Sequence, residues 1–236
     1  MKKIVLSLIV LGVFGCAEMQ QVLDQLPQGT GILSQAEIGN GLKEALNNGI
    51  TKQVSKLTAT DGFFKNEAVK ILLPEELQTV DKKLRQIGMS KLADEGLKLM
   101  NRAAEDAVKE ATPIFVDAVV NMSFSDATTI LMGNESAATQ YLENSTSTAL
   151  YGKFNPVIKS SFEKVGADVV WKNIITKYNT IPLVKKINPD LTDYVTDKAM
   201  EGVFKMIAVE EKDIRNNLAS RTSDLLKRVF ALQDQK

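Results

Sequence analysis

The chain has 236 residues, of which 44% are hydrophobic and 25% are charged, and this balance is typical of a folded globular protein rather than a disordered one. Its 29 basic and 29 acidic side chains cancel, so the basic excess of a nucleic-acid-binding protein is missing and we expect no nucleic-acid partner. The sequence has no histidine, which excludes a Ser-His-Asp triad, a Cys-His pair, an imidazole zinc site and a carboxylate-histidine di-iron centre. Its single cysteine excludes an internal disulfide. We expect neither a metal nor a cofactor.

The first sixteen residues have the pattern of a bacterial lipoprotein signal. Lys2 and Lys3 supply positive charge, and residues 4–14 form an apolar run shorter than the roughly 20 residues that a membrane-spanning helix needs. The run ends in Val-Phe-Gly before Cys16, which resembles the lipobox, where a signal peptidase cleaves and the cysteine thiol receives a diacylglycerol. The alternative is an ordinary cleaved signal, or a signal anchor, followed by an incidental cysteine.

A lipid on Cys16 predicts an exported protein that is anchored to a membrane. Cleavage of residues 1–15 would leave 27 basic and 29 acidic side chains, a net charge of −2. Several acyl chains hold a protein far more firmly than one. Ala17 follows the cysteine, where inner-membrane lipoproteins of enterobacteria carry Asp, so in a Gram-negative host we expect the outer membrane, facing the periplasm. Residues 16–33 are predicted to be the lipidated cysteine and a flexible tether.

From Ser34 onward, apolar residues recur at helical spacing. Ser34 and Glu37 have the spacing of a capping box, so the first helix should begin there. Pro74 is a suitable first residue for a second helix over 75–87, and Gly88 should end that helix.

The longest helical stretch is predicted over 91–121. Pro113 should kink it or divide it in two, because proline lacks the backbone N–H that the helix needs. Small and apolar residues share one arc of this helix: Leu92, Gly96, Leu99, Met100, Ala103, Ala107 and Ala111. The opposite side carries the charged residues Lys98, Arg102, Glu105 and Lys109.

Helices continue after this stretch. Ser123 and Asp126 should cap a short helix that Gly133 stops. Asn134 should start the next helix, and Pro156 is predicted to start a separate one that continues through Val165 and Trp171.

The C-terminal part predicts two more helices. Residues 188–189, Asn-Pro, are a start signal for a helix that is apolar over more than half its circumference, which favours a buried central position. Ser220 should open the last helix, which ends near Phe230. No segment alternates with period two, so we predict one all-α, multi-helix, bundle-like domain over 34–236, with a subdivision considered near 113–156.

Asn101 and Glu105 stand four residues apart on a predicted helix, which invites an active-site interpretation. The structural alternative is that Glu105 forms a solvated pair with Lys109, which stabilises a helix by a few tenths of a kcal/mol. Asn101 lies at the border of the apolar arc and could hydrogen-bond a neighbouring loop.

Glu110 projects within the apolar arc, just before Pro113. A carboxylate there must find a partner, reach solvent or take up a proton. We expect a helix end or a reach to solvent, and the alternative is a buried pair with a basic residue such as Arg215.

Other polar residues are better explained as structural than as catalytic. Asp126 and Thr139 are typical of caps and turns. Residues 210–213, Glu-Glu-Lys-Asp, lack the glycine and the alternating oxygen ligands of a calcium loop, and we interpret Glu211 as part of an acidic helix N-terminus. The candidate functional residues, besides Cys16, are Asn101, Glu105, Glu110, Asp126, Thr139, Tyr141, Glu211 and Arg215.

Several short segments, taken in order, resemble an uncharacterised bacterial family known as domain of unknown function 4197. The resemblance covers about residues 38–230 and implies an exported helical protein, but it supplies no activity and no catalytic residues. The segments that carry it begin at Asp61, Leu73, Met100, Met122, Ala138, Phe154, Asp190 and Glu210: DGF, LPE, MNRAAE, MSFSDA, ATQYL, FNP, DLTDYV and EEKDIR.

The sequence therefore favours a non-enzymatic, lipid-anchored helical module of the bacterial envelope. Its partner would be another envelope protein or an apolar small molecule held between helices, besides the membrane itself. An envelope enzyme that works with carboxylates alone, such as Glu105, Glu110 or Glu211, is the alternative. A third hypothesis is a domain that packs against copies of itself.

Overall fold

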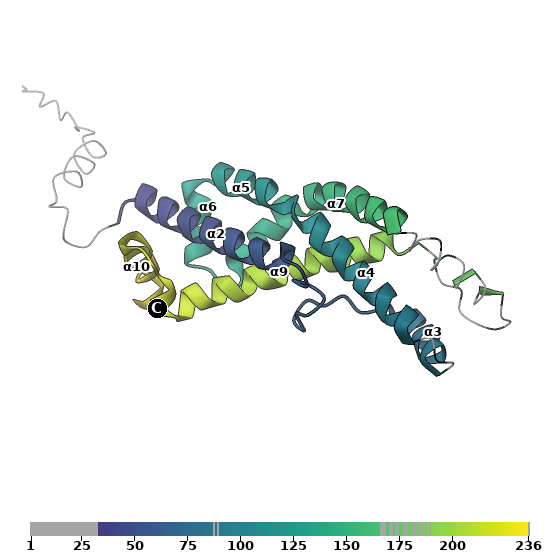
Figure 1. Ribbon diagram of the computed structural model, residues 1–236. Coiled ribbons are helices and arrows are strands. Elements are labelled where there is room, and N and C mark those ends of the chain that lie inside the picture. Colours follow the sequence, from purple (N-terminus) through teal and green to yellow (C-terminus); the bar gives the residue numbers. More distant parts are fainter. Residues whose placement is uncertain are drawn as a thin grey trace, which may run out of the picture. The chain divides into compact units, whose positions relative to one another are not determined.

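The structure is a computed structural model in which the described residues from Ser34 onward belong to one compact unit, Ser34–Lys236. All regular structure among the described residues is helical, so the all-α prediction is confirmed (Figure 1). The predicted signal, Cys16 and nearly all of the predicted tether lie outside the described residues. Those residues are 33–86, 88, 90–165, 169, 172, 175–176, 179–180, 183, 186, 188 and 190–235.

The unit consists of long helices, such as α2, α7 and α9, and shorter ones, such as α6 and α10. Two 3-10 turns, η1 and η2, follow the longer helices near the C-terminus. The bounds are α2 (Gln35–Thr58), α3 (Glu75–Gln86), α4 (Ser90–Val108), α5 (Ala111–Asn121), α6 (Phe124–Leu131), α7 (Ala137–Val165), α9 (Thr192–Asn216), η1 (Leu218–Ser220), α10 (Asp224–Phe230) and η2 (Gln233–Gln235).

The local start and stop signals of the first helices are confirmed. Ser34 Oγ accepts the Glu37 N–H at 3.2 Å, and the Glu37 carboxylate accepts the Ser34 N–H at 3.0 Å, so α2 begins with a full capping box. α3 follows Pro74, and Gly88 lies beyond its end with φ +82°, a conformation that glycine adopts without strain.

Pro113 divides the long predicted helix, as expected. α4 ends at Val108, Lys109 and Glu110 form a turn, and Pro113 becomes the third residue of α5. Backbone N–H groups in the first turn of a helix make no intrahelical hydrogen bond, so a proline there removes none. The proline ring would clash with the carbonyl of Lys109 four residues earlier, so the break precedes the proline.

The prediction that Pro156 starts a separate helix is wrong. α7 runs without interruption from Ala137 to Val165, with Pro156 in its interior. The carbonyl that loses its helical partner belongs to Gly152, and both Gly152 and Pro156 are exposed. Water can therefore bond that carbonyl, and the helix tolerates the proline.

α9 is the central helix. It packs against α2, α4 and α7 (Figure 1), and its residues Val195, Val203 and Ile207 are buried, which confirms the predicted central position. It begins at Thr192, three residues beyond the predicted start signal.

Ser223, not Ser220, caps the last helix, so this part of the prediction is wrong. Ser223 Oγ accepts the Leu226 N–H at 3.1 Å, which opens α10. The Ser220 hydroxyl lies in η1 and donates to Asp213, and this bond lowers the pKa of the Asp213 carboxyl.

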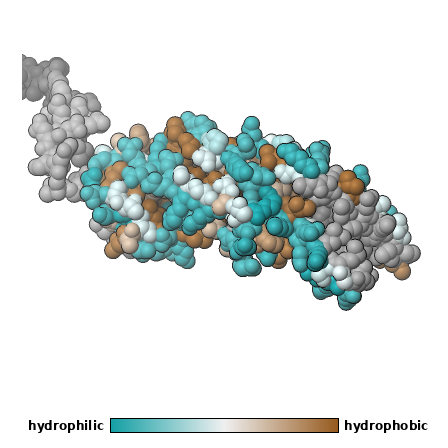
Figure 2. Space-filling model, in the orientation of Figure 1, coloured by the Kyte–Doolittle hydropathy of each residue, from teal (hydrophilic) through white to brown (hydrophobic). Residues whose placement is uncertain are grey.

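The core lies between α2, α4, α5, α7 and α9. Phe115 of α5 and Phe204 of α9 meet edge to face, with ring centroids 5.8 Å apart. Figure 2 shows a mostly hydrophilic surface with scattered hydrophobic spots, as expected for amphipathic helices with their apolar sides inward. Among the described helices, none alone is long and apolar enough to cross a membrane; α5 and α6 together reach that apolar length but meet at a bend of 103°.

Candidate functional site

Asn101 is a structural residue that holds the 59–74 segment onto α4. Its side chain is fully buried; Oδ1 accepts the Ile71 N–H at 2.8 Å, and Nδ2 donates to the Ile71 carbonyl at 2.9 Å. Nδ2 also donates to the Leu97 carbonyl at 2.8 Å. The hydrogen bond to a neighbouring loop that the sequence suggested is therefore confirmed.

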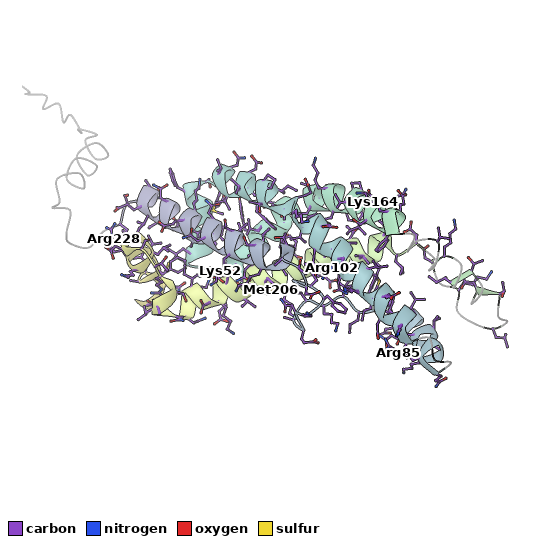
Figure 3. All side chains as sticks on the ribbon, in the orientation of Figure 1. Lys52, Arg85, Arg102, Lys164, Met206 and Arg228 are labelled. Carbon is purple, nitrogen blue, oxygen red and sulfur yellow. The ribbon has the colours of Figure 1, made fainter. Side chains whose placement is uncertain are left out.

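Glu105 fastens the same segment one turn further along α4. Its side chain is buried, and Oε1 accepts the backbone N–H groups of Phe63 at 3.0 Å and Phe64 at 3.4 Å. Its Oε2 bonds Arg102, and Arg102 in turn bonds Asp61; Figure 3 marks Arg102 on α4. Lys65 first, and Arg102 after it, lower the pKa of the Asp61 carboxyl.

The predicted solvated pair between Glu105 and Lys109 is wrong. Lys109 bonds Asp106 instead, at 2.8 Å. A helical wheel treats the charged side of a helix as facing water, whereas here the 59–74 segment covers the edge of that side. Both oxygens of Glu105 are used to hold the fold.

Glu110 is exposed, in the turn that precedes α5. The expectation of a helix end or a reach to solvent is confirmed, and the alternative pair with Arg215 is wrong. The angle assigned to Glu110 assumed a continuous helix, but α4 ends two residues earlier.

Thr139, Glu211 and Arg215 come together in a buried polar cluster. Glu211 Oε1 accepts the Ala138 N–H at 2.9 Å, and Oε2 accepts the Thr139 N–H at 2.8 Å and the Thr139 hydroxyl at 2.7 Å. Glu211 thus caps the N-terminus of α7, where a negative charge is favourable. Residues 210–213 lie near the C-terminal end of α9, so the interpretation of Glu211 as part of its own helix N-terminus is wrong.

Arg215 completes this cluster. It bonds Glu211 at 2.9 Å, donates to the carbonyls of Ile130 and Leu131 at the end of α6, and donates to Gln233. Five donated bonds from one buried guanidinium join α6, α9 and η2. The cluster therefore has a structural role: the Glu211 and Arg215 charges pair with each other and with hydrogen-bonding groups of the protein.

Asp126 and Tyr141 also have structural roles. Asp126 and Ser123 form the capping box of α6, so the capping interpretation is confirmed. The Tyr141 hydroxyl donates to the Ala118 carbonyl at 3.4 Å, and burial raises the pKa of Tyr141.

A cavity of about 400 Å³ between α2, α9 and α10 is the strongest candidate site. Sequence reasoning missed it, because its walls come from segments more than a hundred residues apart. Two small residues of α2, Ala45 and Gly49, leave space beside that helix. Their small size is a local signal in the sequence that could have indicated a cavity. Its apolar walls are formed by Leu42, Ile50, Ile207, Leu226 and Phe230.

The charged groups that line this cavity are paired within the protein. Asn48, Lys52 and Thr222 are exposed polar lining residues, and with the exposed Ala219 they mark the mouth. Lys52, labelled in Figure 3, forms an ion pair with Glu210 of α9, and the buried Glu211–Arg215 pair also lines the cavity. The unpaired surface that the cavity offers a ligand is therefore mainly apolar.

The comparisons with known proteins give a family but no activity. A family model described as "Protein of unknown function (DUF4197)" matches residues 32–231. The resemblance derived from the sequence is confirmed, and the chain belongs to this family. No curated protein and no solved structure matches the chain.

Proposed function

We propose that this member of the DUF4197 family is a lipid-anchored protein of the bacterial envelope that binds an apolar small molecule in the cavity between α2, α9 and α10. The cavity is the observation that carries the binding function. The pattern of residues 1–16 supports the export and the anchor.

The size and the lining of the cavity support an apolar ligand. Small-molecule sites typically enclose about 300–1,000 Å³ and are lined mostly by apolar side chains with a few polar groups. The cavity has about 400 Å³, and its lining includes Leu42 and Ile50 of α2 and Leu226 and Phe230 of α10. A ligand that covers such walls gains about 25 cal/mol for each Å² of apolar surface removed from water.

The residues at the mouth support a ligand with a small polar end. Lys52 is half exposed and Asn48 and Thr222 are exposed, so a polar group at the mouth keeps water contacts while the apolar body is buried. Because the charges of Glu211 and Arg215 are already compensated, a charged group at the bottom would have no partner there.

Filling the cavity tests the binding function. Ala45 lines the cavity and is buried, so Ala45→Trp places a large ring in the space of the ligand. We expect native mass spectrometry of the lipidated protein, purified from its host, to show a bound apolar molecule whose occupancy falls at least tenfold in A45W. The matched control is Ala149→Trp at an exposed site on α7, which should keep the ligand. A wild-type protein without a bound molecule, or a folded A45W with full occupancy, would contradict the proposal.

The anchor has its own test. In the native host we expect radiolabelled palmitate to enter the wild-type protein, and Cys16→Ser to abolish the label and move the protein out of the membrane fraction. Several acyl chains hold a protein at a bilayer, whereas a chain without them has no comparable apolar attachment. Unlabelled wild-type protein, or a C16S protein that stays with the membrane, would overturn the anchor and leave the cavity to be judged separately.

An envelope protein partner and a carboxylate-based enzyme stay alternatives. For the enzyme, Glu105 and Glu211 each use both oxygens in hydrogen bonds to other groups of the protein, and Glu110 is exposed in a turn. Among the described residues, no pair of these three acids shares a partner, so no observation favours that chemistry.

A further inference from the structure

α5 and α6 present an exposed apolar surface, which we call the α5–α6 face and define by Val116, Val120 and Phe124. Their exposed fractions are 38%, 61% and 45%. Val116 and Val120 are four residues apart, so they lie on one side of α5, and Phe124 follows at the start of α6. Lys43 lies against both the Val120 carbonyl and the Phe124 ring, so the three exposed apolar side chains belong to one region of the surface, unlike a single exposed valine.

The polar residues around this face are a mixed set. Lys43 of α2 donates to the Val120 carbonyl at 2.8 Å, and its ammonium lies 5.8 Å from the centre of the Phe124 ring. Asp117 and Asn121 lie on the same exposed side of α5 and bond each other at 3.1 Å. The face is therefore apolar with a cation at one edge and an acid along the helix.

The α5–α6 face lies beside the point where the chain enters the folded unit. A Cβ placed on Gly39 of α2 would come within 2.3 Å of the Phe124 ring, so the ring covers this glycine. Gly39 is five residues beyond Ser34, the N-cap of α2. At about 1.5 Å per helical residue, the start of the unit is only roughly 7–8 Å along α2 from the face.

The chain that precedes α2 limits how far this face can lie from a lipid on Cys16. Eighteen residue steps separate Cys16 from Ser34, and a polypeptide spans at most about 3.3–3.6 Å per residue. The anchor therefore cannot lie more than roughly 65 Å from the start of α2. Attachment to the same bilayer makes contact of the face with lipid intramolecular, so a small apolar patch is sufficient.

We propose that the α5–α6 face docks on the lipid surface that carries the anchor, with Val116, Val120 and Phe124 at the boundary of the acyl chains and Lys43 at the headgroup phosphates. This inference rests on the proposed lipid anchor but not on the ligand cavity. A second copy of the chain is the less favoured occupant, because a stable dimer buries about 800 Å² per partner, far more than three partly exposed side chains supply.

The experiment places an environment-sensitive label on the face. Val120→Cys in the full, lipidated chain provides a free thiol for a nitrobenzoxadiazole label, since the only natural cysteine carries the lipid in the proposed protein. Val209→Cys is the matched control, because Val209 is an exposed valine of α9 with 52% exposure. Both proteins are reconstituted on vesicles of phosphatidylethanolamine and phosphatidylglycerol, with spin-labelled lipid as the quencher.

We expect the label at position 120 to shift to the blue and to be quenched at least threefold more strongly than the label at position 209. Adding Val116→Asp to V120C should remove this difference while the protein still floats with the vesicles. Equal signals at 120 and 209 on floating protein would overturn the docking and leave the anchor intact. Failure of the chain to float would overturn the anchor and the docking together. A shift that depends on protein concentration and not on lipid would assign the face to a second copy and also overturn the docking.

Discussion

Replacing Arg215 by alanine is expected to lower the free energy of unfolding by about 3–5 kcal/mol, the usual effect of removing one partner of a buried ion pair. The guanidinium is buried and donates to Glu211, to two carbonyls at the end of α6 and to Gln233. Without it, the Glu211 carboxylate is left buried beside the N-terminus of α7 with no paired cation. Urea titration followed by circular dichroism measures the change.

The matched control is Arg228→Ala on α10. Arg228 is more than half exposed and pairs with Glu37 at 3.2 Å, so its loss should change the free energy of unfolding by less than about 1 kcal/mol. Equal effects of R215A and R228A would show that the buried cluster does not join α6, α7 and α9. A third variant, Glu211→Gln, keeps the shape but weakens the cap on α7, and we expect a loss between those of the two arginine variants.

Replacing Asn101 by leucine is expected to lower the free energy of unfolding by about 2–4 kcal/mol, because two buried backbone groups of Ile71 lose partners that contribute about 1–3 kcal/mol each. Leucine has a similar volume, so lost packing is a small part of the effect. Hydrogen exchange should locate the change: amides of the 59–74 segment should exchange faster, while those of α9 follow only the global loss of stability.

Asn121→Leu is the control for this variant. Asn121 is exposed and bonds only the exposed Asp117 in the described contacts, so its replacement should change stability by no more than about 0.5 kcal/mol. An N101L protein as stable as N121L, with unchanged exchange in the 59–74 segment, would contradict the role assigned to Asn101.

The errors of the sequence interpretation have specific physical causes. Pro156 was predicted to start a helix because a proline breaks an interior hydrogen bond, but Gly152, whose carbonyl loses that bond, is exposed, so water can replace it. Ser220 and Ser223 are both plausible caps, but in the structure Ser220 bonds Asp213 in η1 and Ser223 caps α10. Glu105 was assigned to solvent because a helical wheel describes one helix alone. It does not include the 59–74 segment, which packs over that side of α4 and buries Glu105.

The amino-acid sequence by itself determined the helical class, the capped starts of α2 and α6, the end of α3 and the division between α4 and α5. These features depend on residues within one or two turns of each other, such as Ser34 with Glu37 and Pro113 with the carbonyl of Lys109. The tertiary structure alone decided the burial of Glu105 and Glu211, because the backbone groups they bond lie 42 and 73 residues away in the chain. It also decided the cavity, whose lining residues on α2, α9 and α10 come together only when α2 packs against both α9 and α10.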